Sequence, residues 1–252
     1  MNDLALLVDL HRTGKRQGPG GDDATRLAIR LSGLADARDL TIADVGCGSG
    51  ASTFVLAHDL DARVTAVDLL PEFLAVLEAA AQRNGLGDRI ETLVAPMDAL
   101  PFGPNTFDAI WSEGAVYTIG FENGIRAWRR FLKPGGILAV SELTWFTQTR
   151  PAELEQHWLG EYAEVATAAA KLAILERNGY APLGYFVLPE RCWLDEYYRP
   201  LQARFADFLA RHGHSAAARS IVDAEQTEID LYERFSAYFG YGYYVARKTQ
   251  DA

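Results

Sequence analysis

Residues 40–50 read LTIADVGCGSG, and this stretch decides the fold. Its first half is a short apolar, β-branched run, which is typical of a buried strand in a parallel sheet. Gly46, Gly48 and Gly50 follow, and a helical pattern begins at once over residues 52–60. Glycines between a strand and a helix let the backbone approach a ligand closely, because side chains there would block it. The loop therefore predicts a nucleotide-like ligand at the carboxyl end of the strand.

Strands and helices alternate on both sides of this loop. Such alternation predicts right-handed crossovers and a parallel, doubly wound sheet that helices cover on both faces. The predicted strands are residues 40–46, 63–69, 89–96, 107–114 and 137–143, and the helices between them are 52–60, 71–85 and 121–132.

The pattern changes after residue 145. Residues 150–179 and 195–240 are predicted to be mainly helical, and two further strands are predicted at 180–189 and 241–248. Near the start, a short apolar helical pattern ends in a glycine-rich and proline-rich segment. Asp22 and Asp23 then stand where the N-cap of the next helix is expected.

Composition narrows the function classes. The chain has 252 residues, 34 acidic against 24 basic, and a formal net charge of −10, so a polyanion is repelled by the average surface. Cys47 and Cys192 form no CxxC pair, and no apolar run approaches the length of a membrane span. We therefore expect a cytoplasmic protein that needs no metal and has neither nucleic acid nor membrane as a partner.

Two more carboxylates strengthen the ligand site. The glycine spacing is GxGxG, which does not satisfy the dinucleotide fingerprint GxGxxG. Asp68 ends the second strand, where a carboxylate can accept both hydroxyls of a ribose. Asp98 follows Met97 at the end of the third strand, where an acceptor and a soft, flat contact suit an adenine.

With these motifs, the chain resembles the class I S-adenosylmethionine-dependent methyltransferases. The resemblance covers roughly residues 20–145, and the predicted final strands fit that family's closing antiparallel hairpin. The stretches of this chain that carry the resemblance are ADVGCGSG, VTAVDLLPEFL, APMDALPFGPNTFDAIWSEGA and LKPGGILAVSE. The phrases QGPG, WSEGAVYTIGF and SELTWF also resemble a bacterial subgroup of the family.

The resemblance implies a Rossmann-like, doubly wound, seven-stranded sheet whose last strand is antiparallel, with helical cap insertions. Gln17 and Gly18 would then lie in a lid over the cofactor. The expected single domain, 1–252, comprises an N-terminal lid (1–20), a cofactor-binding core (21–145), helical cap elements with a strand near 183–188 (146–240), and a closing strand (241–246).

The same resemblance implies roles at the methionine end of S-adenosyl-L-methionine. Asp44 would orient the amino group through water, and Ser112 would offer its carbonyl to that group. Gly46 and Gly48 would let the methionine portion pack on the backbone.

At the other end of the cofactor, Asp68 would hold the ribose with Leu69 beside the adenine. Met97 and Asp98 would hold the adenine itself.

The reaction expected is in-line methyl transfer to a small molecule, which leaves S-adenosyl-L-homocysteine. Alignment of nucleophile, methyl group and sulfur supplies most of the catalysis, and a base is needed only if the nucleophile carries a proton. Glu113 is the leading choice for a base or an orienting carboxylate, with Tyr117 and Glu142 as further catalytic candidates. Candidate substrate contacts are Trp145, His157, Trp158, Tyr162, Trp193 and Tyr197.

The acceptor stays open, because the chain lacks the signatures of nucleobase, metalloid and well-known O-methyltransferase subfamilies. An aromatic, carboxylate-rich cap suits a small amine or a planar aromatic compound, and the protein is expected to be a monomer or homodimer. Two alternatives remain. One is a non-catalytic S-adenosylmethionine-binding or regulatory protein. The other is an NAD(P)-dependent oxidoreductase, which the glycine spacing opposes.

Overall fold

The computed structural model describes residues 3–250, which form one mixed sheet with helices around it. The strand order is β3-β2-β1-β4-β5-β8-β7, and the short strand β6 pairs with β5 off this path. The strands are β1 (Leu40–Val45), β2 (Ala62–Asp68), β3 (Ile90–Val94), β4 (Phe107–Glu113), β5 (Leu132–Trp145), β6 (Ala166–Thr167), β7 (Tyr180–Val187) and β8 (Phe239–Lys248).

The first five strands are parallel to one another, and β8 runs antiparallel to both of its neighbours, β5 and β7. This confirms the predicted doubly wound α/β fold with an antiparallel last strand. The chain order of the strands reverses at β1, next to β4. In such sheets a crevice opens beyond the carboxyl ends of the strands at the reversal, and ligands bind there.

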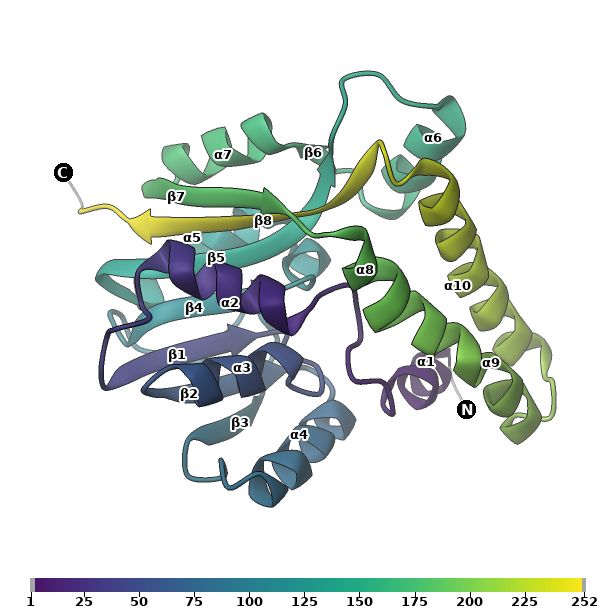
Figure 1. Cartoon of the computed structure of the whole chain (residues 1–252), viewed down its shortest axis with the longest axis horizontal. Coiled ribbons are helices and arrows are strands. Elements are labelled where there is room, and N and C mark those ends of the chain that lie inside the picture. Colours follow the sequence, from purple (N-terminus) through teal and green to yellow (C-terminus); the bar gives the residue numbers. More distant parts are fainter. Residues whose placement is uncertain (1–2, 251–252) are drawn as a thin grey trace.

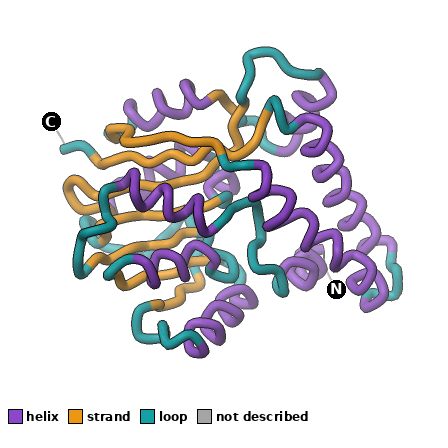
Figure 2. Tube along the Cα trace, in the orientation of Figure 1, coloured by secondary structure: helices purple, strands orange, loops and turns teal. Residues whose placement is uncertain are grey.

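Helices cover both faces of the sheet (Figures 1 and 2). One apolar cluster packs α2, α3 and α4 against one face, and a second packs α5 and α7 against the other. The helices around the sheet are α2 (Asp22–Ser32), α3 (Ala51–Asp59), α4 (Pro71–Arg83), α5 (Phe121–Trp128) and α7 (Ala168–Arg177), with the 3₁₀ turns η1 (Val116–Ile119) and η2 (Arg129–Phe131).

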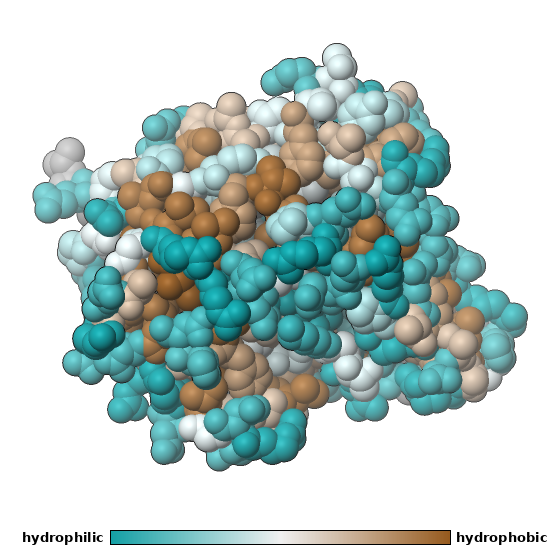
Figure 3. Space-filling view, viewed as in Figure 1, coloured by the Kyte–Doolittle hydropathy of each residue, from teal (hydrophilic) through white to brown (hydrophobic). Residues whose placement is uncertain are grey.

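The remaining helices form a cap beyond the carboxyl ends of the parallel strands, at the right of Figure 1. A third apolar cluster, rich in Trp, Tyr and Phe, holds the cap together. Figure 3 shows mainly hydrophilic residues over the outward sides of α9 and α10, as expected of helices whose apolar stripe faces inward. The cap consists of α1 (Asp3–His11), α6 (Ala152–Glu161), α8 (Glu190–Trp193), the π-helical turn η3 (Leu194–Tyr198), α9 (Arg199–Arg211) and α10 (Ala216–Phe235).

The structure differs from the sequence prediction in three details. Strand β5 begins at Leu132 rather than at residue 137, because the chain pairs with β4 before and after a register shift. The two-residue strand β6 was not predicted. Gly21, not an aspartate, is the N-cap of α2, and Asp22 and Asp23 occupy its first turn. The predicted domain limits 1–252 include residues 1–2 and 251–252, which lie outside the described residues.

The described residues contain neither a membrane-spanning helix nor a cluster of metal ligands. No helix within residues 3–250 is long and apolar enough to cross a bilayer. No group of three or more His, Cys, Asp or Glu side chains in that range is arranged to hold a metal ion.

Glu142, predicted to be catalytic, forms a buried ion pair with Lys171 of α7. The side chains are 1% and 0% exposed, and Nζ lies 3.4 Å from Oε1. Burial raises the pKa of Glu142 and lowers the pKa of Lys171, and each partner opposes the other's shift. The ammonium also lies 4.6 Å from the centre of the Phe121 ring. These contacts tie β5 to the helices on one face of the sheet.

Replacing Lys171 with Met is expected to lower the free energy of unfolding by about 3–5 kcal/mol, because Glu142 is left buried without its cation. Urea unfolding at neutral pH measures the loss. The double variant E142L/K171M removes both charges and should recover most of it. If K171M were as stable as the parent, or the double variant no better than K171M, the pair would have no such structural role.

Candidate functional site

The glycine loop after β1 needs glycine for two reasons. Gly46 and Gly48 have φ angles of +73° and +55°, in the left-handed region that side chains disfavour. A Cβ on Gly46 would collide with the Cβ of Ala115, and one on Gly48 with the amide oxygen of Gln17. The loop is therefore shaped by what packs on it as well as by its own backbone.

Asp68, at the end of β2, holds this loop in place. Its Oδ2 accepts a hydrogen bond from the Gly48 N–H at 2.9 Å, and its Oδ1 accepts one from the Leu70 N–H at 2.9 Å. Burial raises the pKa of Asp68, and the backbone donors oppose that rise. A carboxylate has about four acceptor positions, so Asp68 keeps capacity for ligand hydroxyls.

Asp44 lies beneath the loop and is fully buried. Its Oδ2 accepts hydrogen bonds from the hydroxyls of Ser52 (2.8 Å) and Thr53 (2.6 Å), which joins β1 to the first turn of α3. Burial raises the pKa of Asp44 to about 7. Its Oδ1 is buried and has no hydrogen-bond partner among the described residues.

The loops after β1 to β4 enclose a first cavity of about 470 Å³. Eight of the ten residues predicted to bind the cofactor line it, while Asp44 and Ser112 are buried behind its wall. The eight are Gln17, Gly18, Gly46, Gly48, Asp68, Leu69, Met97 and Asp98.

Trp128 and Thr118 hold the turn at Met97 in place. The indole N–H of Trp128 donates to the Met97 carbonyl at 2.8 Å. The Thr118 hydroxyl lies 3.1 Å from the Met97 sulfur. The thioether is thus held as one wall of the cavity, with the exposed carboxylate of Asp98 beside it.

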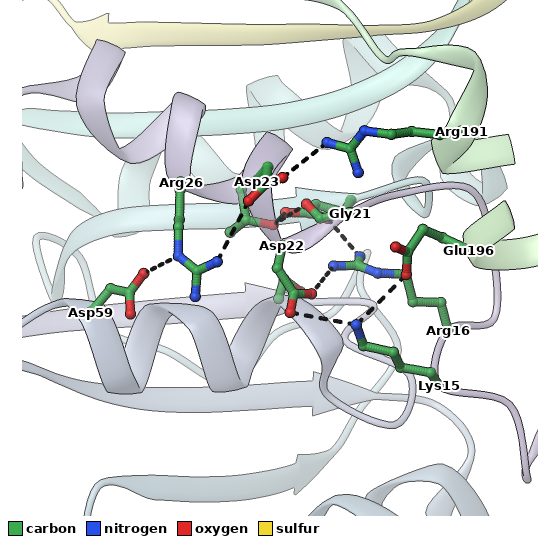
Figure 4. Close-up of polar contacts among 12 residues, drawn as sticks. Lys15, Arg16, Gly21, Asp22, Asp23, Arg26, Asp59, Arg191 and Glu196 are labelled. Atoms are coloured by element: carbon green, nitrogen blue, oxygen red, sulfur yellow. Dashed lines mark hydrogen bonds and ion pairs between the residues drawn. The ribbon is translucent and has the colours of Figure 1, made fainter.

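The segment between α1 and α2 is tied down by ion pairs (Figure 4). Arg16 is buried and reaches Asp22 with Nη2 at 3.0 Å. Lys15 bridges Asp22 and Glu196, and Arg191 reaches Asp23 at 3.1 Å. The segment is therefore joined to both the core helix α2 and the cap.

Glu113 is the inner anchor of that segment. Its Oε2 accepts from Nη1 of Arg16 at 3.2 Å. Its Oε1 accepts from the hydroxyl of Thr25 (2.6 Å), the hydroxyl of Tyr243 (3.0 Å) and the indole N–H of Trp111 (3.1 Å). With four donors on one carboxylate, the geometry favours a positioning role over that of a free base.

Gln17 joins the same segment to the glycine loop. Its amide oxygen accepts hydrogen bonds from the N–H of Ser49 at 2.8 Å and the hydroxyl of Ser49 at 3.0 Å. Its amide nitrogen donates to the carbonyls of His11 and Gly14. The side chain thus fastens the segment over the start of α3.

A second cavity of about 530 Å³ lies between the first one and the cap. The two cavities share a wall made of Gln17, Gly18, Pro19, Gly114 and Tyr117. The second cavity is lined by the aromatic residues Tyr117, Trp158, Tyr162, Trp193, Tyr197 and Tyr241 and by His157, Glu161, Glu225 and Glu228, among others.

The predicted acceptor-site residues divide between this cavity and the core. Five of the six predicted substrate contacts line the second cavity, and the sixth, Trp145, packs on Phe239 in the apolar interior of the cap. Glu142 lines neither cavity. Successive side chains of a strand point to opposite faces, so with Leu143 at the second cavity Glu142 faces the other way.

Four charged residues at the site were not predicted: Arg16, Glu161, Glu225 and Glu228. Glu225 and Glu228 share a helix face with Ile221, Ile229 and Tyr232, by their spacing in α10. Two carboxylates within an apolar helical stripe were a readable signal of an acidic cavity.

Comparison with known proteins bears on this geometry. Residues 43–140 match the family described as a methyltransferase domain. The chain is 34% identical over 104 residues to erythromycin 3''-O-methyltransferase of Saccharopolyspora erythraea, a match covering 40% of this chain and 34% of that protein. It is 29% identical over 182 residues to malonyl-[acyl-carrier protein] O-methyltransferase of Dechloromonas aromatica, covering 66% of each chain. The match thus spans less than two thirds of either relative.

Likeness in structure extends over nearly the whole chain. A methyltransferase of Geobacter sulfurreducens, solved in complex with S-adenosyl-L-homocysteine, superposes with a TM-score of 0.81 at 19% identity. The superposition covers 98% of this chain and 97% of that one. Residues 43–140 thus match a methyltransferase domain, and the sheet built around them has the fold of the S-adenosylmethionine-dependent methyltransferases.

Proposed function

We propose that the protein is an S-adenosylmethionine-dependent methyltransferase that acts on a small molecule. The observation that carries the proposal is the pair of cavities sharing one wall at Gly114, Tyr117 and residues 17–19. One cavity has the glycine loop and the carboxylates at the strand ends. The other has the space and the side chains for an acceptor.

The first cavity fits the cofactor. Gly46 and Gly48 line it without side chains, and Asp68 has acceptor capacity for the two ribose hydroxyls. Met97 would contact the adenine, Asp98 would accept from its amino group, and Leu69 would cover it. When bound, S-adenosylmethionine supplies an electrophilic methyl group on a sulfonium.

At the methionine end, we propose that Gly46 and Gly48 pack on the ligand. Asp44 would act through water, and the Ser112 carbonyl would accept a hydrogen bond from the amino group. The unpartnered Oδ1 of Asp44 supports this role, because a buried polar atom needs a hydrogen-bond partner.

Catalysis would rest on alignment and exclusion of water, which can supply about 7–11 kcal/mol of the barrier lowering. Tyr117, at the shared wall, would contact both ligands. Glu113 would act as a positioning residue that holds Arg16 and the segment after α1, rather than as a base. Glu142 would serve stability through Lys171.

The subgroup phrases support one common site. Gln17, Gly18 and Pro19 of QGPG, Gly114 and Tyr117 of WSEGAVYTIGF, and Leu143 of SELTWF all line the second cavity. We propose that these phrases mark proteins with a similar acceptor site. The net charge of −10 supports the further proposal that the protein does not act on nucleic acid. We also propose that it is a cytoplasmic monomer or homodimer.

Calorimetric titration tests the proposal. S-adenosyl-L-homocysteine should bind, and NADH should not. Replacing Asp68 with Ala should weaken the binding by about 1–3 kcal/mol, because charged hydrogen bonds are lost. Asp36→Ala, at an exposed position, is the matched control and should bind like the parent. The assignment would be contradicted if NADH bound and S-adenosyl-L-homocysteine did not. It would also be contradicted if D68A bound S-adenosyl-L-homocysteine with the parent's affinity.

A second prediction concerns the segment over the cofactor. Replacing Gln17 with Ala removes two hydrogen bonds to Ser49, so S-adenosyl-L-homocysteine should bind more weakly by about 1–2 kcal/mol and dissociate faster. Stopped-flow fluorescence measures the dissociation rate. Gln148→Ala, at an exposed position, controls for loss of an amide. An unchanged dissociation rate in Q17A would show that the segment does not retain the ligand.

A further inference from the structure

The charge of the second cavity is one-sided. Glu161, Glu225 and Glu228 line it, and none of the described residues that line it is Lys or Arg. Glu225 is paired with His11 of α1, whose Nε2 lies 2.9 Å from Oε1. Glu161 and Glu228 are therefore carboxylates at the cavity without a basic partner in its lining.

Glu228 is a half-buried carboxylate of this cavity. It lies on α10 and accepts a hydrogen bond from the Tyr198 hydroxyl at 2.7 Å. Burial raises its pKa to about 7, and Glu225 and Glu161 add to the rise while Tyr198 and His11 oppose it. A carboxylate kept in such surroundings is stabilised when a cation approaches it.

Aromatic rings form the rest of the wall. Trp193, Tyr197 and Tyr241 line the cavity together with Glu228. A cation over the face of such rings gains about 0.5–2 kcal/mol, more when it is desolvated. A neutral planar ligand would gain from the rings but would leave the acidic groups without a partner.

Two indole N–H groups also remain unused. The side chains of Trp193 and Trp158 line the cavity, and the residues are 1% and 9% exposed. Neither Nε1 has a hydrogen-bond partner among the described residues. A buried donor without a partner points to a ligand that carries an acceptor, and a neutral oxygen suits a cavity without basic side chains.

We infer that the second cavity binds a small amine that carries no anionic group, and that Glu228 and the surrounding rings hold its positive charge. The inference rests on the proposed function and names its acceptor class. A carboxylate or phosphate on the acceptor would meet the acidic groups of the cavity and no Lys or Arg to neutralise it.

An amine acceptor also suits the chemistry of methyl transfer. The ammonium form of the amine first loses one proton to water. The lone pair of the resulting neutral nitrogen then forms the new C–N bond, and the electrons of the broken C–S bond return to sulfur. Positive charge therefore passes from sulfur to nitrogen. Fixed negative charge and ring faces at the nitrogen's position stabilise that developing charge without reorganisation.

Choline and its analogues test the inference without turnover. Choline is a permanent cation with a neutral hydroxyl, 3,3-dimethylbutan-1-ol is its uncharged isostere, and glycine betaine adds a carboxylate. In titrations of the protein saturated with S-adenosyl-L-homocysteine, choline should bind at least about ten-fold more tightly than either analogue. Equal or tighter binding of the isostere or of betaine would overturn the inference, as would failure of choline to bind.

Matched variants locate the charge partner. Glu228→Gln should weaken choline binding by about five-fold or more and leave the affinity for S-adenosyl-L-homocysteine unchanged. Glu233→Gln, exposed on the same helix, should change neither affinity. Unchanged choline binding in E228Q would remove Glu228 from the site. Failure of the parent protein to bind S-adenosyl-L-homocysteine would instead refute the proposed function.

The same probe predicts a pH dependence. Because Glu228 ionises as pH rises through about 7, choline affinity should increase between about pH 6 and pH 8. E228Q should flatten this rise, and a parent profile that is already flat would contradict the role of Glu228. The other titratable groups near Glu228 are Glu225 on α10, His11 on α1, Glu161 on α6, Tyr198 and Tyr197 on η3, Tyr117 on η1 and Tyr241 on β8.

Discussion

The buried ion pair of Arg16 and Glu113 is the contact on which the site depends. Both side chains are nearly inaccessible, at 5% and 7% exposure. Such a pair is stable only when further hydrogen bonds satisfy both groups, and here Thr25, Trp111 and Tyr243 satisfy the carboxylate. The pair fixes the segment after α1 against the end of β4, and that segment divides the space under the cap into two cavities.

The two cavities differ in what lines them, and the difference follows from the fold. The first is built at the carboxyl ends of β1 to β4, where backbone N–H groups and short loops meet. The second lies under helices that must bury a wide apolar face, so aromatic side chains dominate it. Acidic residues within that face, such as Glu228, then give the second cavity its negative charge.

Local patterns predicted the parallel sheet and the glycine loop and strand-end carboxylates of the first cavity, and the resemblance to the methyltransferases implied the antiparallel last strand. Gly48, Asp68 and Asp98 follow strands within a few residues, so their positions depend on short stretches of chain. The acceptor side was predicted only in part. Glu142 was placed at the site because it ends a strand, but strand alternation turns it toward Lys171. Arg16 was missed because its partner Glu113 is 97 positions away, whereas Glu228 stands in a local pattern of α10 that was not used.

The sequence by itself determined a glycine loop between a strand and a helix, carboxylates at successive strand ends, and an acidic chain. Each of these features depends only on residues that lie close together in the sequence. Only the tertiary structure decided that Arg16 meets Glu113, across 97 positions, and that α6, η3 and α10 close one acidic, aromatic cavity. Such contacts arise when burial of apolar faces packs distant segments together, and no local pattern specifies them.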